Sequence, residues 1–154
     1  MNVILGAVIL LHPIAALILI WTFMKQRKWR QQKSFLKNQN YKISLEQHRI
    51  NGNKLMLGTI FVVLLAFIAE IIRAWIDQVP IFSYIIPNNF HASGGILGVI
   101  LMIILWNSGH STNKKQGQNS FSRSRDLHGR LGDIMSILII IHAFLGFLYL
   151  LQII

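Results

Sequence analysis

The chain has 154 residues, enough for a single domain spanning 1–154, and 53% of them are hydrophobic. Its charged residues, 15 Lys or Arg and 5 Asp or Glu with a net charge of +10, stand in a few segments between long apolar runs. This segregation excludes an ordinary soluble domain. The excess of basic residues does not indicate a nucleic-acid partner, because Lys and Arg are enriched in the loops that flank membrane spans. The absence of cysteine excludes disulfides, iron–sulfur clusters and thioether-attached haem.

The apolar runs predict an all-α membrane protein, an up-down bundle of four transmembrane helices. Each run has about the 20 residues that cross ~30 Å of hydrocarbon at ~1.5 Å per residue. We interpret the first run as a transmembrane helix, not a signal peptide, because no basic segment precedes it and no small-x-small cleavage site follows it. The predicted helices cover about residues 3–24, 45–76, 88–107 and 125–153.

Two of these helices are expected to begin inside basic segments. Ser44 with Gln47 three residues later is a capping-box pattern. A helix that begins near residue 45 has His48 in its first turn. Ser124 is a candidate cap for the fourth helix, which puts His128 in its first or second turn.

The basic residues also predict the orientation. The segment Lys25–Lys54 has nine Lys or Arg and Asn107–Leu127 has four, whereas Asp77–Phe90 has none. Loops rich in Lys and Arg stay on the cytoplasmic side. We therefore expect both termini to face the periplasm or the lumen, in a bacterial inner membrane or a thylakoid membrane.

Histidines are the chemistry-bearing residues of this chain. An ionisable side chain within a membrane is costly, so each one is a functional candidate, although a lone His that bonds a neighbouring carbonyl is an equally good interpretation. His128 and His142 are 14 residues apart, which puts both on one helix face, ~21 Å apart along the axis. This spacing suits two haems stacked across a bilayer.

A glycine follows several histidines at a distance of four residues, which is one helical turn. A small residue beside a ligand leaves space for a flat porphyrin, and helix packing uses glycine in the same way. The pattern occurs at His48/Gly52, His91/Gly95, His128/Gly132 and His142/Gly146.

Depth along the helices predicts the pairs. His12 and His142 lie at similar depths from the outer side, which predicts an outer haem. His48 and His128 lie at the inner starts of their helices, which predicts an inner haem. His91, at the outer start of the third helix, is an alternative ligand of the outer haem or part of a quinol site.

Several further residues have two interpretations each. Arg49 and Arg130 stand beside His48 and His128, where they could pair with haem propionates or simply add to the positive-inside charge. His110 is expected to be a solvated loop residue. Glu70 and Arg73, three residues apart, are expected to pair with each other, and the alternative is a proton path to a quinol.

The segments His12-Pro-Ile-Ala-Ala, His48-Arg-Ile-Asn-Gly and His128-Gly-Arg-Leu-Gly to His142-Ala-Phe-Leu-Gly resemble the four-helix bacterial cytochrome b561 family. That resemblance implies two b-type haems, with ligands on the first and second helices and two on the fourth. The chain departs from the pattern in the greater depth of His12 and in an inverted orientation. It is also similar in layout to a four-helix family of cyanobacteria and plastids, of no established function, that opens with His-Pro in its first helix.

Together these features predict a membrane electron carrier that holds two haem b groups (heme B) without covalent attachment. The protein would supply ligands and burial, and the iron would supply the redox chemistry. A membrane quinone is the expected partner, so a quinol-linked oxidoreductase is possible, alone or within a larger membrane complex. The alternatives are a chlorophyll-binding subunit and an accessory or assembly subunit of a photosynthetic or respiratory complex without redox haem.

Overall fold

The computed structural model of the chain describes residues 3–32 and 38–153. Those residues form α1 (Val3–Gln32), α2 (Asn38–Ile76), the short α3 (Phe82–Ile85), α4 (Phe90–Lys114) and α5 (Phe121–Ile153). No strand occurs in the described part of the chain. The predicted all-α fold is therefore confirmed, and the single turn of α3 in the loop after α2 is an element that the sequence did not predict.

Within the described residues, four helices are long and apolar enough to cross a membrane. The candidate spans are Gly6–Trp29, Asn40–Ile76, Phe90–Lys114 and Phe121–Gln152. Large apolar side chains cover the outside of the bundle, among them Leu57, Trp75 and Phe144, which are 67%, 80% and 60% exposed. An apolar exterior of this kind is stable in hydrocarbon, where water does not penalise it.

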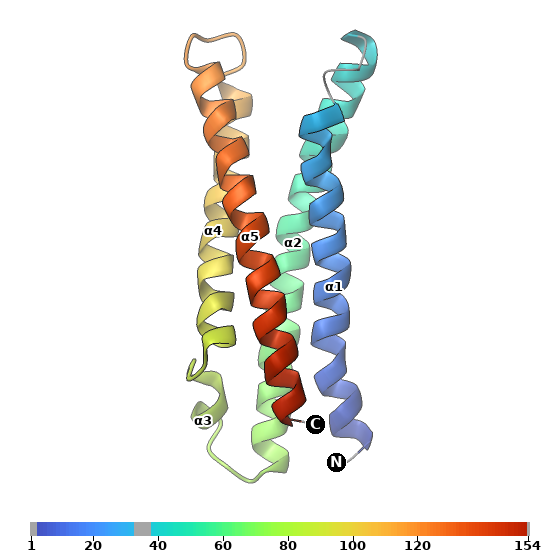
Figure 1. Cartoon of the computed structure of the whole chain (residues 1–154), viewed down its shortest axis with the longest axis vertical. Coiled ribbons are helices and arrows are strands. Elements are labelled where there is room, and N and C mark those ends of the chain that lie inside the picture. Colours follow the sequence, from blue (N-terminus) through green and yellow to red (C-terminus); the bar gives the residue numbers. More distant parts are fainter. Residues whose placement is uncertain (1–2, 33–37, 154) are drawn as a thin grey trace.

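The four long helices alternate in direction and form two hairpins (Figure 1). The helices α1 and α2 pack extensively against each other, as do α4 and α5, whereas contacts between the two hairpins are sparser. The described ends of the chain and α3 lie at one end of the bundle, and the loop between α4 and α5 lies at the other (Figure 1). We call these the terminal end and the loop end.

The helices extend further at the loop end than expected. The first and third were predicted to end near residues 24 and 107, but α1 continues to Gln32 and α4 to Lys114. The apolar runs mark only the part of a helix that matches hydrocarbon, whereas backbone hydrogen bonds continue into polar sequence.

The predicted starts at residues 45 and 125 were also wrong, because α2 is already helical at Asn38 and α5 begins at Phe121. Neither serine is an N-cap. Ser44 accepts a hydrogen bond from the Trp29 indole, and the Ser124 hydroxyl bonds Thr112 at 3.0 Å. His48 consequently lies well inside α2, not in its first turn.

A small core joins the two hairpins near mid-bundle. Every long helix contributes to it, through Phe23, Leu55, Met102, Leu105 and Met135. These side chains are 5–8% exposed. The core keeps the four helices in register, which sets the depths at which their histidines meet.

Candidate functional site

Three histidines from three helices meet toward the terminal end. The ring of His91 on α4 stacks on His142 of α5, with centroids 4.1 Å apart and planes at 17°. The same ring stands edge-to-face with His12 of α1, at 6.2 Å and 74°. His91 is therefore the shared neighbour of the other two. We call these three residues the outer cluster.

Local structure at the start of α4 fixes His91. The N-cap residue Asn89 is extended, and its side chain accepts a hydrogen bond from the backbone N–H of Ala92 at 2.8 Å. An Asn at this position satisfies one of the unpaired donors of the first turn. His91 is the second residue of the helix, so this cap stabilises the turn that carries it.

Backbone carbonyls fix the tautomers of two rings in the outer cluster. His12 Nδ1 lies 3.1 Å from the Val62 carbonyl oxygen, and His91 Nδ1 lies 3.2 Å from that of His142. A carbonyl only accepts, so each Nδ1 carries the proton and each Nε2 keeps its lone pair. The buried Nδ1 of His142 has no hydrogen-bond partner within the described chain. Two of these rings therefore keep the lone pair on Nε2, the atom that a metal-ligating imidazole supported at Nδ1 would use.

Glycines let the helices approach these rings. A Cβ atom at Gly146 would stand 2.6 Å from His91 Cε1, and one at Gly95 would stand 3.3 Å from His142 Cε1. Each glycine receives a ring from the neighbouring helix, in addition to following a histidine on its own helix. Any larger residue at position 146 would displace His91.

Two more histidines meet toward the loop end. The rings of His48 on α2 and His128 on α5 are 6.3 Å apart between centroids, with planes at 89°. Both rings are partly buried. The two belong to different hairpins, and we call the pair the inner cluster.

A serine on α4 fixes the tautomer of His128. The Ser108 hydroxyl donates to the Leu105 carbonyl at 2.7 Å and lies 2.9 Å from His128 Nδ1. Its single proton is used by Leu105, so its oxygen accepts from His128 Nδ1–H. Nε2 of His128 keeps the lone pair. A Cβ atom at Gly109 would stand 3.1 Å from His128 Cε1, so this ring also fills the space above a glycine.

His48 is held differently, by two residues of α1. The Gln26 side-chain amide donates to His48 Nδ1 at 2.8 Å and to the His48 carbonyl at 2.5 Å. The Trp29 indole stacks on the ring, with centroids 4.5 Å apart. In this arrangement the ring proton belongs on Nε2, whereas His12, His91 and His128 carry it on Nδ1.

The apolar core separates the two clusters along the bundle. On α5, Met135 lies midway between His128 and His142; on α2, Leu55 follows His48 and precedes the Val62 carbonyl that His12 contacts. The 14 residues between the histidines of α5 correspond to ~21 Å of helix. The bundle therefore has two separate polar sites inside an apolar exterior.

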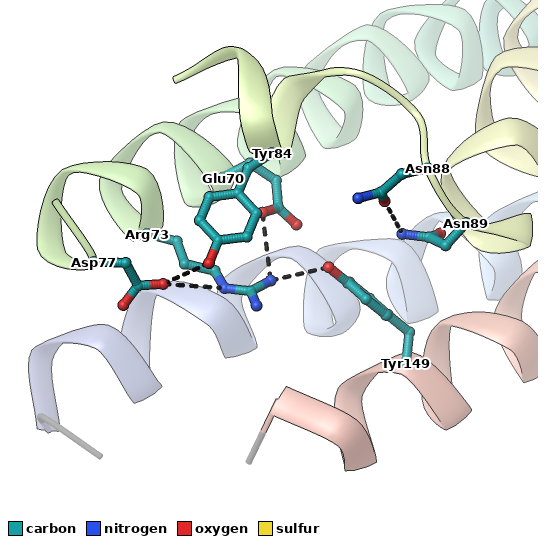
Figure 2. Close-up of polar contacts among 7 residues, drawn as sticks. All are labelled: Glu70, Arg73, Asp77, Tyr84, Asn88, Asn89 and Tyr149. Atoms are coloured by element: carbon teal, nitrogen blue, oxygen red, sulfur yellow. Dashed lines mark hydrogen bonds and ion pairs between the residues drawn. The ribbon is translucent and has the colours of Figure 1, made fainter. Parts of the chain in front are cut away.

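A polar network extends the outer cluster to the terminal end (Figure 2). Arg73 donates to the Tyr149 hydroxyl at 2.9 Å and lies 3.6 Å from Glu70 and 3.9 Å from Asp77. The Tyr149 ring stacks with His91 at 6.2 Å. The expected Glu70–Arg73 pair is thereby confirmed, and it is linked through Tyr149 to the histidines.

The loop after α2 closes this network from outside the membrane spans. Tyr84 on α3 donates a hydrogen bond to Asp77 at 2.7 Å, and the Arg73 guanidinium lies 4.3 Å from the centre of its ring (Figure 2). The hydrogen bond to Asp77 raises the pKa of Tyr84 above the ordinary phenol value.

The remaining predicted residues lie outside these contacts. Arg49 pairs with Glu46 and Gln116, at 3.2 Å each, and Arg130 is exposed. His110 is exposed as expected, but it lies within α4 and not in a loop, and it bonds the carbonyl of Trp106 in the same helix at 3.1 Å. A Cβ atom at Gly52 or Gly132 would meet no atom within 4 Å, so both positions are open.

Several contact residues were not found by sequence reasoning. Gln26, Trp29, Ser108, Gly109 and Tyr149 hold or border the histidine rings through contacts between different helices. They share no sequence signal: four of them lie in the polar segments that flank the apolar runs, and Tyr149 is one aromatic residue within a run. Their partners depend on helix rotation, which a single sequence does not give.

Within the described residues, no group of three or more His, Cys, Asp or Glu side chains could hold a bare metal ion. A haem takes only its axial ligands from the protein, so this observation concerns other kinds of metal site. No protein-family model, curated protein or solved structure matches the chain.

Proposed function

We propose that this chain is a transmembrane electron carrier that holds one b-type haem at the inner cluster and one at the outer cluster. The observation that carries the proposal is the meeting of histidines from different hairpins at two depths, with the apolar core between them. The sparser contacts between hairpins support it further, because a flat group is admitted more easily there than inside a tightly packed hairpin.

Ring spacing is the first test of fit. Each metal–imidazole bond is about 2 Å long, and the ring centre lies about 1 Å beyond the nitrogen, so two rings on one metal have centres roughly 6 Å apart. His48 and His128 are separated by 6.3 Å, and His12 and His91 by 6.2 Å. The stacked rings of His91 and His142, at 4.1 Å, are too close to hold one iron as they stand.

The outer haem therefore has competing ligand pairs. Matching depth favours His12 with His142, and ring spacing favours His12 with His91. Pairing His12 with His142 requires the His91 ring to leave its position beside both. His12 belongs to both of these pairs, whereas a third assignment, His91 with His142, leaves it out.

Donor chemistry is the second test of fit. A hydrogen bond from Nδ1 to a carbonyl or hydroxyl is the usual support of a metal-ligating imidazole, and His12, His91 and His128 each have one. His48 would need its Gln26 partner to rotate, so that the amide oxygen accepts from Nδ1–H. Iron would supply reversible one-electron chemistry, while this chain supplies ligands, burial and hydrogen bonds that set the potential.

The proposed setting follows from the distribution of charge. The loop end, which holds the basic segments, lies on the cytoplasmic or stromal side, and both termini face the periplasm or lumen of a bacterial inner membrane or thylakoid. A membrane quinone is the proposed electron partner, because an apolar bundle with polar sites at two depths admits lipid-soluble carriers.

An absorption spectrum of the purified chain tests the proposal. We expect a reduced-minus-oxidised difference band of b type and about two haems per chain by pyridine haemochrome analysis. One haem per chain would remove one cluster from the proposal. A chlorophyll band, or no pigment at all in a folded preparation, would contradict it and favour a pigment-binding or an accessory subunit respectively.

A further inference from the structure

A groove between α1 and α2 lies beside the inner cluster and is not used by the proposed haem ligands other than His48. Its cavity volume is about 820 Å³. Exposed side chains on its rim, Trp21 at 61% and Ile43 at 66%, show that it opens to the outside of the bundle. An occupant can therefore enter from the surrounding membrane.

The groove is positively charged. Lys25 and Lys54 line it, and no Asp or Glu is among the described residues that do so. The Lys25 ammonium lies 4.2 Å from the centre of the Trp21 ring, an arrangement that holds a cation by its attraction to the aromatic face. Neither lysine has an ion-pair partner in the described chain, so both charges remain for a ligand.

The two lysines stand at the same level of the membrane. Lys25 follows the apolar run of the first helix, and Lys54 precedes that of the second. Because these helices are adjacent and antiparallel, the ends of the two apolar runs put both ammonium groups at the level where hydrocarbon would give way to headgroups. Leu19 and Leu55, on the hydrocarbon side, give the groove an apolar floor.

Neutral polar groups complete the lining. The Gln47 amide donates to the Asn51 oxygen at 2.9 Å, which leaves the Asn51 amide nitrogen as a donor. Gln47 and Asn51 both line the groove with the lysines. Ammonium and amide donors above apolar side chains are the complement of a phosphate joined to acyl chains.

We propose that this groove binds the headgroup phosphate of an anionic phospholipid, with Lys25 and Lys54 as its charged contacts. The acyl chains would follow the apolar side toward mid-membrane. This assignment does not depend on haem, because it rests on the charge, depth and opening of the groove alone.

Native mass spectrometry of the detergent-purified full chain tests the assignment, with phosphatidylglycerol and phosphatidylcholine as probes. The wild type should retain one phosphatidylglycerol in preference to phosphatidylcholine. Replacing both groove lysines (K25Q with K54Q) should weaken retention about 30-fold, since each basic residue contributes about 1 kcal/mol to an anionic headgroup. The matched control, K28Q with K42Q, removes the same charge from exposed positions of the same helices outside the groove and should retain the lipid.

Four outcomes would overturn the proposal. Equal retention of both lipids would show no headgroup selectivity, and equal loss in the control variant would show that only net charge matters. Displacement by millimolar inorganic phosphate would assign the groove to the free ion, and displacement by a short-chain quinone would assign it to the redox partner. Helix content by circular dichroism confirms that each variant is folded.

Discussion

The imidazole of His91 on α4 lies directly over Gly146 on α5, where an added Cβ atom would stand 2.6 Å from Cε1. Gly146→Ala should therefore force the ring or the helices apart. We expect a loss of stability of about 1–3 kcal/mol, the usual cost of overpacking, read as a lower thermal midpoint in detergent. Gly98→Ala is the control, because its Cβ would meet nothing within 4 Å. Equal midpoints for the two variants would contradict this packing.

Histidine variants test the two proposed haem sites separately. His48→Ala and His128→Ala should each remove the inner haem and leave the outer one, because a low-spin bis-histidine iron needs both ligands. His110→Ala should leave both haems, since that ring bonds only within its own helix. Haem per chain and the low-temperature difference spectrum measure the result. Loss of both haems in a folded single variant would show that the clusters are not independent.

The outer haem is expected to depend on His12, and two further variants identify its partner. If the ligands are His12 and His91, the pair with the right ring spacing, His91→Ala removes the outer haem and His142→Ala leaves it. If the ligands are His12 and His142, the pair matched in depth, His142→Ala removes the outer haem and His91→Ala leaves it. An intact outer haem in His12→Ala would rule out both pairs and leave His91 with His142. If His91→Ala instead keeps both haems and slows reduction by quinol, His91 belongs to a substrate site.

Ser108 should affect the affinity and the midpoint potential of the inner haem without binding the iron. Its oxygen accepts from His128 Nδ1–H, and loss of such a support typically costs about 10–100-fold in metal affinity. We expect Ser108→Ala to weaken inner haem retention and shift its midpoint potential in a redox titration. Ser136→Ala is the control, a buried serine whose hydroxyl donates only to a backbone carbonyl. An unchanged potential in Ser108→Ala would remove the serine from the site.

Alkaline pH should open the contact between α3 and the end of α2. The pKa of Tyr84 is raised in the folded protein, mainly by its hydrogen bond to Asp77. The contact thus contributes fully below the phenol's ordinary pKa and is lost as pH rises through the raised value. Asp77→Ala should lower the pKa of Tyr84 in a phenolate absorbance titration, with Tyr84→Phe identifying its band. An unchanged titration in Asp77→Ala would contradict the contact.

The charge asymmetry predicts that a C-terminal tag is reached by protease from the periplasmic or lumenal side alone. Inside-out and right-side-out vesicles distinguish the two faces. Digestion from the cytoplasmic side would reverse the orientation and would put the lysine groove on the other surface.

The sequence by itself was sufficient for the helical fold, the number of candidate spans and the separation of His128 from His142 along one helix. Those features follow from hydropathy and from the constant rise of a helix, both of which are local. It also identified the Glu70–Arg73 pair, which needs only neighbouring turns of one helix. It underestimated helix length, because hydrophobicity ends where hydrocarbon ends whereas helical hydrogen bonding continues.

Only the tertiary structure decided which rings touch. His12 and His142 were paired by depth, yet His91 stands beside both, because contact depends on helix rotation and on which helices are adjacent. For the same reason, the sequence did not predict the contact of Ser108 with His128 or that of Gly146 with His91. The depth of a residue depends on its own helix alone, whereas a site is formed by the facing surfaces of several helices. No local sequence pattern specifies how each helix is rotated about its axis, so the sequence did not predict these contacts.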